Sequence, residues 1–155
     1  MIDVIDLARS QLGVCESGGP NRGEPFTRYS LPGEDPLPWC ARFLRWVFAQ
    51  AGHQLPGNPY EIASVASLQA ALAVSGAWLG RDGVAPRRGD IVLFGPGSMS
   101  DTNRPGRHCG VIEEVSGPYI YSIEGNWGDA VSRICRRLDD RVIWGYARWP
   151  LPPQA

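Results

Sequence analysis

Hydrophobic residues recur at helical spacing through the first half of the chain and alternate with polar residues through much of the second half. The helical spacing predicts helices over residues 2–12, 38–51 and 60–74, and a glycine ends each of the first two. Residues 14–36 are rich in Gly, Pro, Asn and Ser, which predicts an irregular loop. The first half is therefore expected to be helical.

From Gly89 onward the hydrophobic period shortens to that of a strand. Five strands are expected, at residues 91–94, 108–115, 119–124, 131–138 and 142–149. Helices followed by a sheet indicate the α+β class. With 155 residues, of which 43% are hydrophobic and 20% charged, the chain is expected to form one domain over residues 1–155, with its core at about 4–149.

Charge and composition exclude several classes of function. The formal net charge is −1 and the arginines are scattered, which argues against nucleic acid as a partner. All 15 basic residues are arginine, so a Walker-type phosphate loop and a Schiff-base lysine are excluded. No apolar stretch approaches the roughly 20 residues of a membrane span, so an integral membrane protein is not expected. Acidic residues near Met1 argue against a secretory signal peptide; we expect synthesis in the cytoplasm.

Three segments carry residues suited to nucleophilic catalysis. Cys40 lies in the first turn of the second predicted helix, on its apolar face, where the helix N-terminus favours a thiolate. His108 opens a strand and supplies a base. Glu124 and Asn126 end the next strand, and antiparallel pairing places both about level with His108, where either can orient the imidazole. Taken singly, a buried structural cysteine, a surface histidine and an ordinary Glu-Gly-Asn turn are the more common interpretations, but the agreement of the three in order and predicted geometry favours a catalytic site.

The other cysteines have no obvious catalytic role. The four cysteines form no CxxC pair and only two histidines are present, so the close ligand spacing of a structural zinc site is missing. Cys109 and Cys135 fall in apolar strands and are expected to be buried, packing as small hydrophobic residues. A disulfide among Cys15 and the other cysteines stays open.

The chain resembles a CHAP domain, the cysteine, histidine-dependent amidohydrolase/peptidase module of the papain-like and NlpC/P60-type superfamily. The segments that carry this resemblance are Pro38-Trp39-Cys40-Ala41-Arg42-Phe43, Arg88-Gly89-Asp90-Ile91-Val92-Leu93-Phe94, His108-Cys109-Gly110-Val111-Ile112, Ile123-Glu124-Gly125-Asn126 and Gly145-Tyr146-Ala147-Arg148. It implies a papain-like fold, with N-terminal helices packed on a five- to six-stranded antiparallel sheet.

The resemblance also implies roles and a substrate. Cys40 would be the nucleophile, His108 the general base, Glu124 the orienting acid and Asn126 an accessory polar group. The substrate would be bacterial peptidoglycan, cleaved as by an N-acetylmuramoyl-L-alanine amidase or by a peptidase acting on stem or cross-bridge peptides. Because no signal peptide is expected, the periplasm or extracellular wall would be reached by a non-classical route.

Two departures from the family pattern affect these expectations. Cys109 occupies a position where the family usually has a small aliphatic residue, and it faces away from His108, so neutral packing is expected. The acidic calcium loop of some members is missing, because Glu34 and Asp35 alone offer too few ligands. We therefore expect neither a metal nor another cofactor.

Three aromatic residues, Trp39, Tyr121 and Trp127, are predicted to line the substrate groove, although core packing is an equal alternative for most tryptophans.

The protein is expected to be a monomer. A protein partner also remains open, and it would be a holin, an immunity protein or a delivery protein. Two other functions also remain open. One is a cysteine amidase or protease effector that acts on a non-wall protein or small amide, and the other is a non-catalytic binding module of a virion or secretion apparatus.

Overall fold

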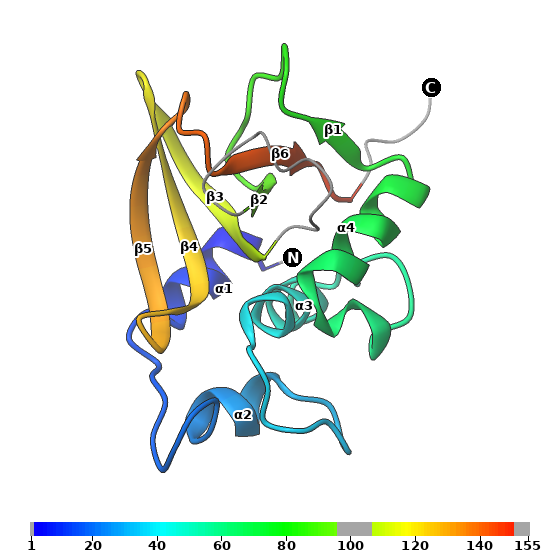
Figure 1. Ribbon diagram of the computed structural model, residues 1–155, viewed down its shortest axis with the longest axis vertical. Coiled ribbons are helices and arrows are strands. Elements are labelled where there is room, and N and C mark those ends of the chain that lie inside the picture. The colour runs from blue at the N-terminus through cyan, green and yellow to red at the C-terminus, as the bar shows by residue number, and fades with distance from the viewer. Residues whose placement is uncertain (1, 96–106, 151–155) are drawn as a thin grey trace.

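The computed structural model describes residues 2–95 and 107–150 (Figure 1). Short helices occupy the first half of the chain, as the hydrophobic spacing predicts. They are α1 (Val4–Ser10), α2 (Glu24–Tyr29), α3 (Cys40–Gln50), the 3-10 helix η1 (Glu61–Ala63) and α4 (Val65–Val74). The predicted helix over 60–74 is divided at Ser64, whose side chain caps α4 by accepting a hydrogen bond from the Ser67 amide.

A single antiparallel sheet forms the second half. Its strands are β1 (Trp78–Gly80), β2 (Ile91–Phe94), β3 (His108–Ser116), β4 (Tyr119–Trp127), β5 (Ala130–Arg137) and β6 (Ile143–Ala147). Their order across the sheet is β1-β6-β2-β3-β4-β5. The α+β class and the predicted sheet of five to six antiparallel strands are thus confirmed, with six strands present in the described residues. Strands β3, β4 and β5 form a continuous meander that includes His108 and Glu124.

Two elements differ from the sequence prediction. Helix α2 lies inside the predicted loop 14–36, where Pro25 provides a first-turn residue that needs no amide hydrogen bond. Strand β1 lies between the third predicted helix and the first predicted strand, where no element was expected, and it pairs with β6 at the edge of the sheet. Both elements are too short, at six and three residues, to show a hydrophobic period.

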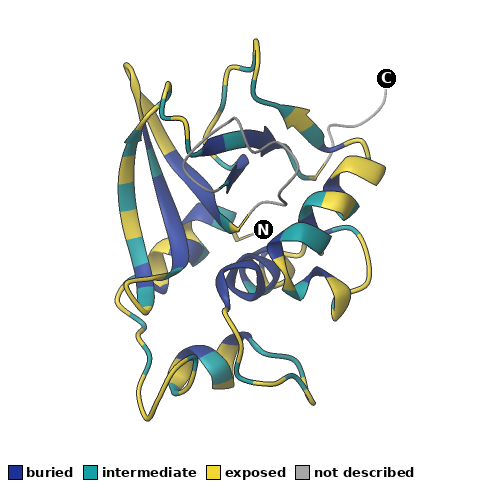
Figure 2. Ribbon diagram, in the orientation of Figure 1, coloured by how far each residue is buried: buried dark blue, intermediate teal, exposed yellow. Residues whose placement is uncertain are grey.

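The core forms where α3 packs against β3 and β4. Figure 2 shows α3 as almost entirely buried, and its residues Phe43, Leu44, Val47 and Phe48 are each 0% exposed. Gly125 on β4 allows this close approach, since a Cβ atom there would lie 2.6 Å from the Cβ of Phe43. The packing brings the first turn of α3 to the end of the sheet at which β3 begins.

All four cysteines are free thiols, so no disulfide links them. Cys109 is buried, as predicted, whereas Cys135 is exposed, and the expectation of burial is wrong for it. The alternating burial along β5 explains the difference, because Cys135 occupies one of its exposed positions. Within residues 2–95 and 107–150, no helix has the length and hydrophobicity to span a membrane.

Candidate active site

Cys40 is the first residue of α3. Trp39 forms the N-cap, and its side chain makes no capping hydrogen bond to the amides of the first turn. The Cys40 side chain is largely buried, with the residue 6% exposed. Uncapped amides and the helix dipole both favour a negative charge at this position, so the first turn is suited to hold a thiolate.

His108 and Glu124 form a hydrogen-bonded pair on neighbouring strands. The distance between His108 Nε2 and Glu124 Oε2 is 2.7 Å. The pairing of Val111 with Ile123 sets this register and brings Glu124 near the start of β3, as the hairpin geometry predicts. Because Nε2 contacts the carboxylate, Nδ1 is the ring nitrogen left for the hydrogen bond between His108 and Cys40.

The thiol and the imidazole shift each other's titration in opposite directions. Hydrogen bonds with Cys109 and His108 outweigh burial and lower the pKa of Cys40 to about 5. Burial lowers the pKa of His108, but its hydrogen bonds with Cys40 and Glu124 prevail and raise that pKa to about 9. Between these two values the site holds a thiolate beside an imidazolium, which is the reactive form of a cysteine nucleophile.

Cys109 contacts Cys40 from the face of β3 opposite to the one that carries His108. Strand alternation places Cys109 and His108 on different faces, as the sequence predicts. The face that Cys109 occupies is the one that packs on α3, and there its thiol hydrogen-bonds with Cys40. The prediction of neutral packing is therefore wrong, since this contact favours the Cys40 thiolate.

The Glu124 carboxylate is fully buried, and among the described residues it has three hydrogen-bonding partners. Besides His108, Ser122 Oγ donates to Oε1 at 2.6 Å, and Arg136 on β5 donates to both carboxylate oxygens. Burial raises the pKa of Glu124, but hydrogen bonds from His108 and Arg136 outweigh it and lower this pKa overall. The carboxylate is thus held ionised and in one orientation.

Arg136 was not predicted from the sequence, in which it is one of 15 scattered arginines. The available signal was the alternation along β5, which places Arg136 on the same sheet face as Ser122 and Glu124. Arg136 pairs with Ile120 in the ladder, and its long side chain reaches along β4 to the carboxylate. Predicting the contact between Arg136 and Glu124 from the sequence would have required the register of β4 against β5.

Gly110 provides the space that the Glu124 side chain occupies. A Cβ atom at Gly110 would lie 2.6 Å from Glu124 Cγ and 3.0 Å from the carbonyl oxygen of Ile123. The missing side chain at Gly110 therefore makes room for the orienting carboxylate.

Asn126 lies near His108 in the chain register but is not hydrogen-bonded to it. Its backbone has a φ of 59°, at an irregularity between Glu124 and Trp127 that interrupts the pairing of β4 with β5. Among the residues that the structure describes, Glu124 is the side chain that hydrogen-bonds His108 Nε2. The accessory role of Asn126 stays a prediction.

Of the three predicted groove aromatics, Trp127 lies beside the site. Its ring centroid is 5.7 Å from that of His108, and Trp127 is 46% exposed. Trp39 is only 1% exposed, stacks on Tyr29 and donates its indole N–H to Glu16, so its assignment to the groove is wrong. The physical reason is its position as N-cap, from which it packs into the core.

Tyr121 is the other incorrect assignment. It lies three residues before Glu124 on β4, and the ladder to β5 is regular between the two. An odd separation along a regular strand places their side chains on opposite faces of the sheet. Tyr121 hydrogen-bonds with Cys135 on that other face and does not line the site.

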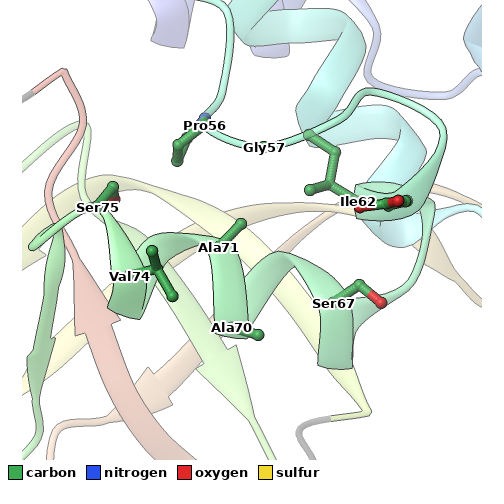
Figure 3. A pocket seen from close by; sticks show the side chains of 9 residues that line it. Pro56, Gly57, Ile62, Ser67, Ala70, Ala71, Val74 and Ser75 are labelled. Carbon is green, nitrogen blue, oxygen red and sulfur yellow. The ribbon is translucent and has the colours of Figure 1, made fainter.

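A hollow of about 560 Å³ opens at Cys40. It is lined by Cys40, Leu37, Tyr60, Ser64 and Arg107, among others. A second hollow, of about 530 Å³, runs along α4 and is shown in Figure 3. Its wall contains Pro56, Ile62 and Val74 but no histidine or cysteine, so the hollow at Cys40 is the candidate substrate site.

Glu34, which was weighed as a metal ligand, is bound by arginine instead. Arg45 donates to its two carboxylate oxygens at 2.6 and 2.7 Å, and Arg42 Nε lies 3.5 Å away. Two guanidinium groups thus supply the positive charge around this buried carboxylate. In residues 2–95 and 107–150, no three His, Cys, Asp or Glu side chains gather in a way that could hold a metal ion.

Comparison with known proteins identifies a family and a fold. The CHAP domain family model matches residues 32–126, which is more than half of the chain. The crystal structure of Ly7917 matches with a TM-score of 0.58 and 16% identity, and that of Ly7917 with the hydrolyzing product of MDP matches with 0.58 and 15%. Each match covers 92% of this chain and 60% of the Ly7917 chain, and it supports the papain-like fold. No curated protein matches the sequence significantly.

Proposed function

Because the chain belongs to the CHAP domain family of amidohydrolases and peptidases, we propose that it hydrolyses an amide bond of bacterial peptidoglycan. The single observation that carries the proposal is the hydrogen-bonded series from Cys40 through His108 to Glu124, beside the hollow at Cys40. A thiolate, an imidazolium and a buried carboxylate in this order are the components of acyl transfer by a cysteine hydrolase.

The proposed reaction begins with the Cys40 thiolate attacking the carbonyl carbon of the amide. The carbonyl π electrons move to oxygen, and the uncapped amides at the start of α3 stabilise the resulting oxyanion. The imidazolium of His108 then protonates the leaving amine as the C–N bond breaks, leaving a thioester on Cys40. Glu124 keeps the imidazole in the tautomer and orientation that this transfer requires.

Hydrolysis of the thioester completes the cycle. His108, now neutral, takes a proton from water as the water oxygen attacks the acyl carbon. The C–S bond breaks, the carboxylic acid leaves, and Cys40 returns to the thiolate beside a protonated His108. In this proposal Trp127, which is exposed beside His108, offers a flat apolar surface to sugar or peptide groups of the wall polymer.

Digestion of purified wall sacculi, followed by mass spectrometry of the released fragments, tests this function. We expect soluble fragments with new termini either at the bond between sugar and stem peptide or within the peptides. Cys40→Ala should abolish release, whereas Cys15→Ala, which removes an exposed thiol, should leave it intact.

The same experiment separates the alternatives. Labelling of Cys40 by a thiol-directed acyl probe without release of wall fragments would favour an amidase or protease with a different substrate. Wall binding that survives Cys40→Ala, without release by the wild type, would favour a binding module.

A further inference from the structure

Arg136 lies on β5, which pairs with β4, the strand that carries Glu124. Figure 1 shows these two strands side by side. Its side chain is only 8% exposed. The guanidinium carbon is 4.0 Å from the ring centroid of Phe94 and 5.0 Å from that of Trp127. Phe94 and Trp127 are also the two rings beside His108, at centroid distances of 5.8 and 5.7 Å. Arg136 and His108 thus share the same two aromatic neighbours.

The guanidinium contacts both oxygens of the Glu124 carboxylate. Nη1 donates to Oε1, which also accepts from Ser122, and Nη2 donates at 3.2 Å to Oε2, which also contacts His108. Glu124 is 0% exposed, and a buried carboxylate can stay ionised only when hydrogen bonds and opposite charges offset the cost of removing it from water. A paired fork of donors also fixes the plane of the carboxylate, which a single donor does not.

We propose that Arg136 is a positioning residue that keeps Glu124 ionised and correctly oriented toward His108. The proposal rests on the proposed roles of Cys40, His108 and Glu124, but it does not depend on the identity of the substrate. Arg136 does not touch the reacting thiol, and it acts on the imidazole through the carboxylate.

Arg136 differs from the other ionisable groups around Glu124 in how its charge responds to pH. His108 faces the carboxylate from β3, the Cys109 thiol interacts with it across the same strand, and Cys40 lies beyond them at the start of α3. These three groups change charge as they titrate, whereas a guanidinium stays positive throughout the working range. The charge of Arg136 therefore holds Glu124 ionised at pH values where the other groups give up or take protons.

Loss of Arg136 should move the lower pH limit of the site upward. Without the guanidinium, burial dominates and the pKa of Glu124 rises, so the carboxylate becomes neutral at a higher pH. A neutral Glu124 no longer stabilises the imidazolium of His108. The thiolate of Cys40 then loses its partner, and it too is protonated at a higher pH.

The test measures the rate of alkylation of Cys40 by iodoacetamide as a function of pH, with peptide mapping by mass spectrometry to isolate this cysteine. In Arg136→Met we expect the lower inflection to rise by about one pH unit, which makes the rate at pH 5 about fivefold slower because the wild-type inflection lies near that pH. Arg136→Lys should recover more than half of this shift because it keeps the charge. The matched control is Arg137→Met, since Arg137 is exposed, pairs with Asp139 and has the same charge.

A second comparison tests whether Arg136 acts through Glu124. In a Glu124→Gln background, adding Arg136→Met should change the alkylation rate at pH 5 by less than twofold. A further loss of about fivefold in that background would overturn the proposal, as would an Arg136→Met inflection equal to that of Arg137→Met in a folded protein. Alkylation needs no substrate, so failure to digest walls would overturn the proposed substrate without affecting this test.

Discussion

The thiol of Cys109 hydrogen-bonds with the sulfur of Cys40, and it does so from the helix-facing side of β3 while His108 lies on the other side. Burial raises the pKa of Cys109 well above its ordinary value, so Cys109 stays protonated and can donate its S–H to the neighbouring thiolate. The candidate nucleophile is therefore stabilised from two directions.

Removing this second thiol should raise the pKa of Cys40. In Cys109→Ala the lower limb of the pH–activity profile should move above pH 5, because a hydrogen bond that favours the thiolate is lost. Cys109→Ser keeps a donor and should move the limb less. The measurement is the hydrolysis rate from pH 4 to 8, with Cys135→Ala as the control for loss of a distant thiol. A limb that stays in place in Cys109→Ala would contradict the role of this contact.

Glu124→Gln should lower the upper limit of activity. In the wild type, we expect a bell-shaped profile between about pH 5 and about pH 9, set by the thiolate–imidazolium pair. Glu124 helps to raise the pKa of His108, so its replacement should bring the upper limb down toward the ordinary value of 6.5. The rate at the optimum should fall by a factor on the order of 10² to 10⁴, because the imidazole loses its orienting group. An upper limb that remains near pH 9 would contradict this assignment.

Gly110 and Gly125 provide a matched pair of substitutions with different consequences. A Cβ at either position would meet a side-chain carbon at 2.6 Å, belonging to Glu124 in one case and to Phe43 in the other. Both alanine variants should lose about 1–3 kcal/mol in the free energy of unfolding. Only Gly110→Ala should also shift the pH–activity limbs, because it displaces Glu124. Equal profiles in the two variants, measured alongside urea unfolding, would argue against this distinction.

The buried ion pair between Glu34 and Arg45 should be a major determinant of stability. Glu34→Gln leaves the guanidinium of Arg45 without its carboxylate and should lower the free energy of unfolding by about 3–5 kcal/mol. The matched control is Asp35→Asn, because Asp35 is the exposed neighbouring acid. Urea unfolding at neutral pH checks both variants, and equal losses would contradict a special role for Glu34.

The pH dependence of this contribution follows from the pKa of Glu34. Burial raises that pKa, but the hydrogen bonds from Arg45 and the charge of Arg42 outweigh burial and lower the pKa overall. The folded value therefore lies below the unfolded one. The stabilisation is therefore fully present above the unfolded pKa and is lost as the pH falls through the folded pKa. The difference in stability between wild type and Glu34→Gln should shrink in acid.

The sequence predicted the elements whose hydrophobic period is long enough to read. The alternation along β3 and β4 placed His108 and Glu124 close together because hairpin pairing fixes their register. The sequence did not predict Arg136, because its contact with Glu124 depends on the register of the next strand, which ends in an irregularity. Trp39 was misassigned for a related reason, since its indole is held by Glu16, 23 residues earlier in the chain.

Arginine pairs with four buried acidic side chains in the described part of the chain, as the pairs Glu34–Arg45, Asp90–Arg148, Glu113–Arg133 and Glu124–Arg136. A guanidinium does not release its proton in alkaline solution, whereas an ammonium group does. The fold should therefore persist above pH 9, where His108 becomes neutral and hydrolysis stops. A sample held above pH 9 should be inactive but folded, and its activity should return at once when it is transferred to neutral buffer.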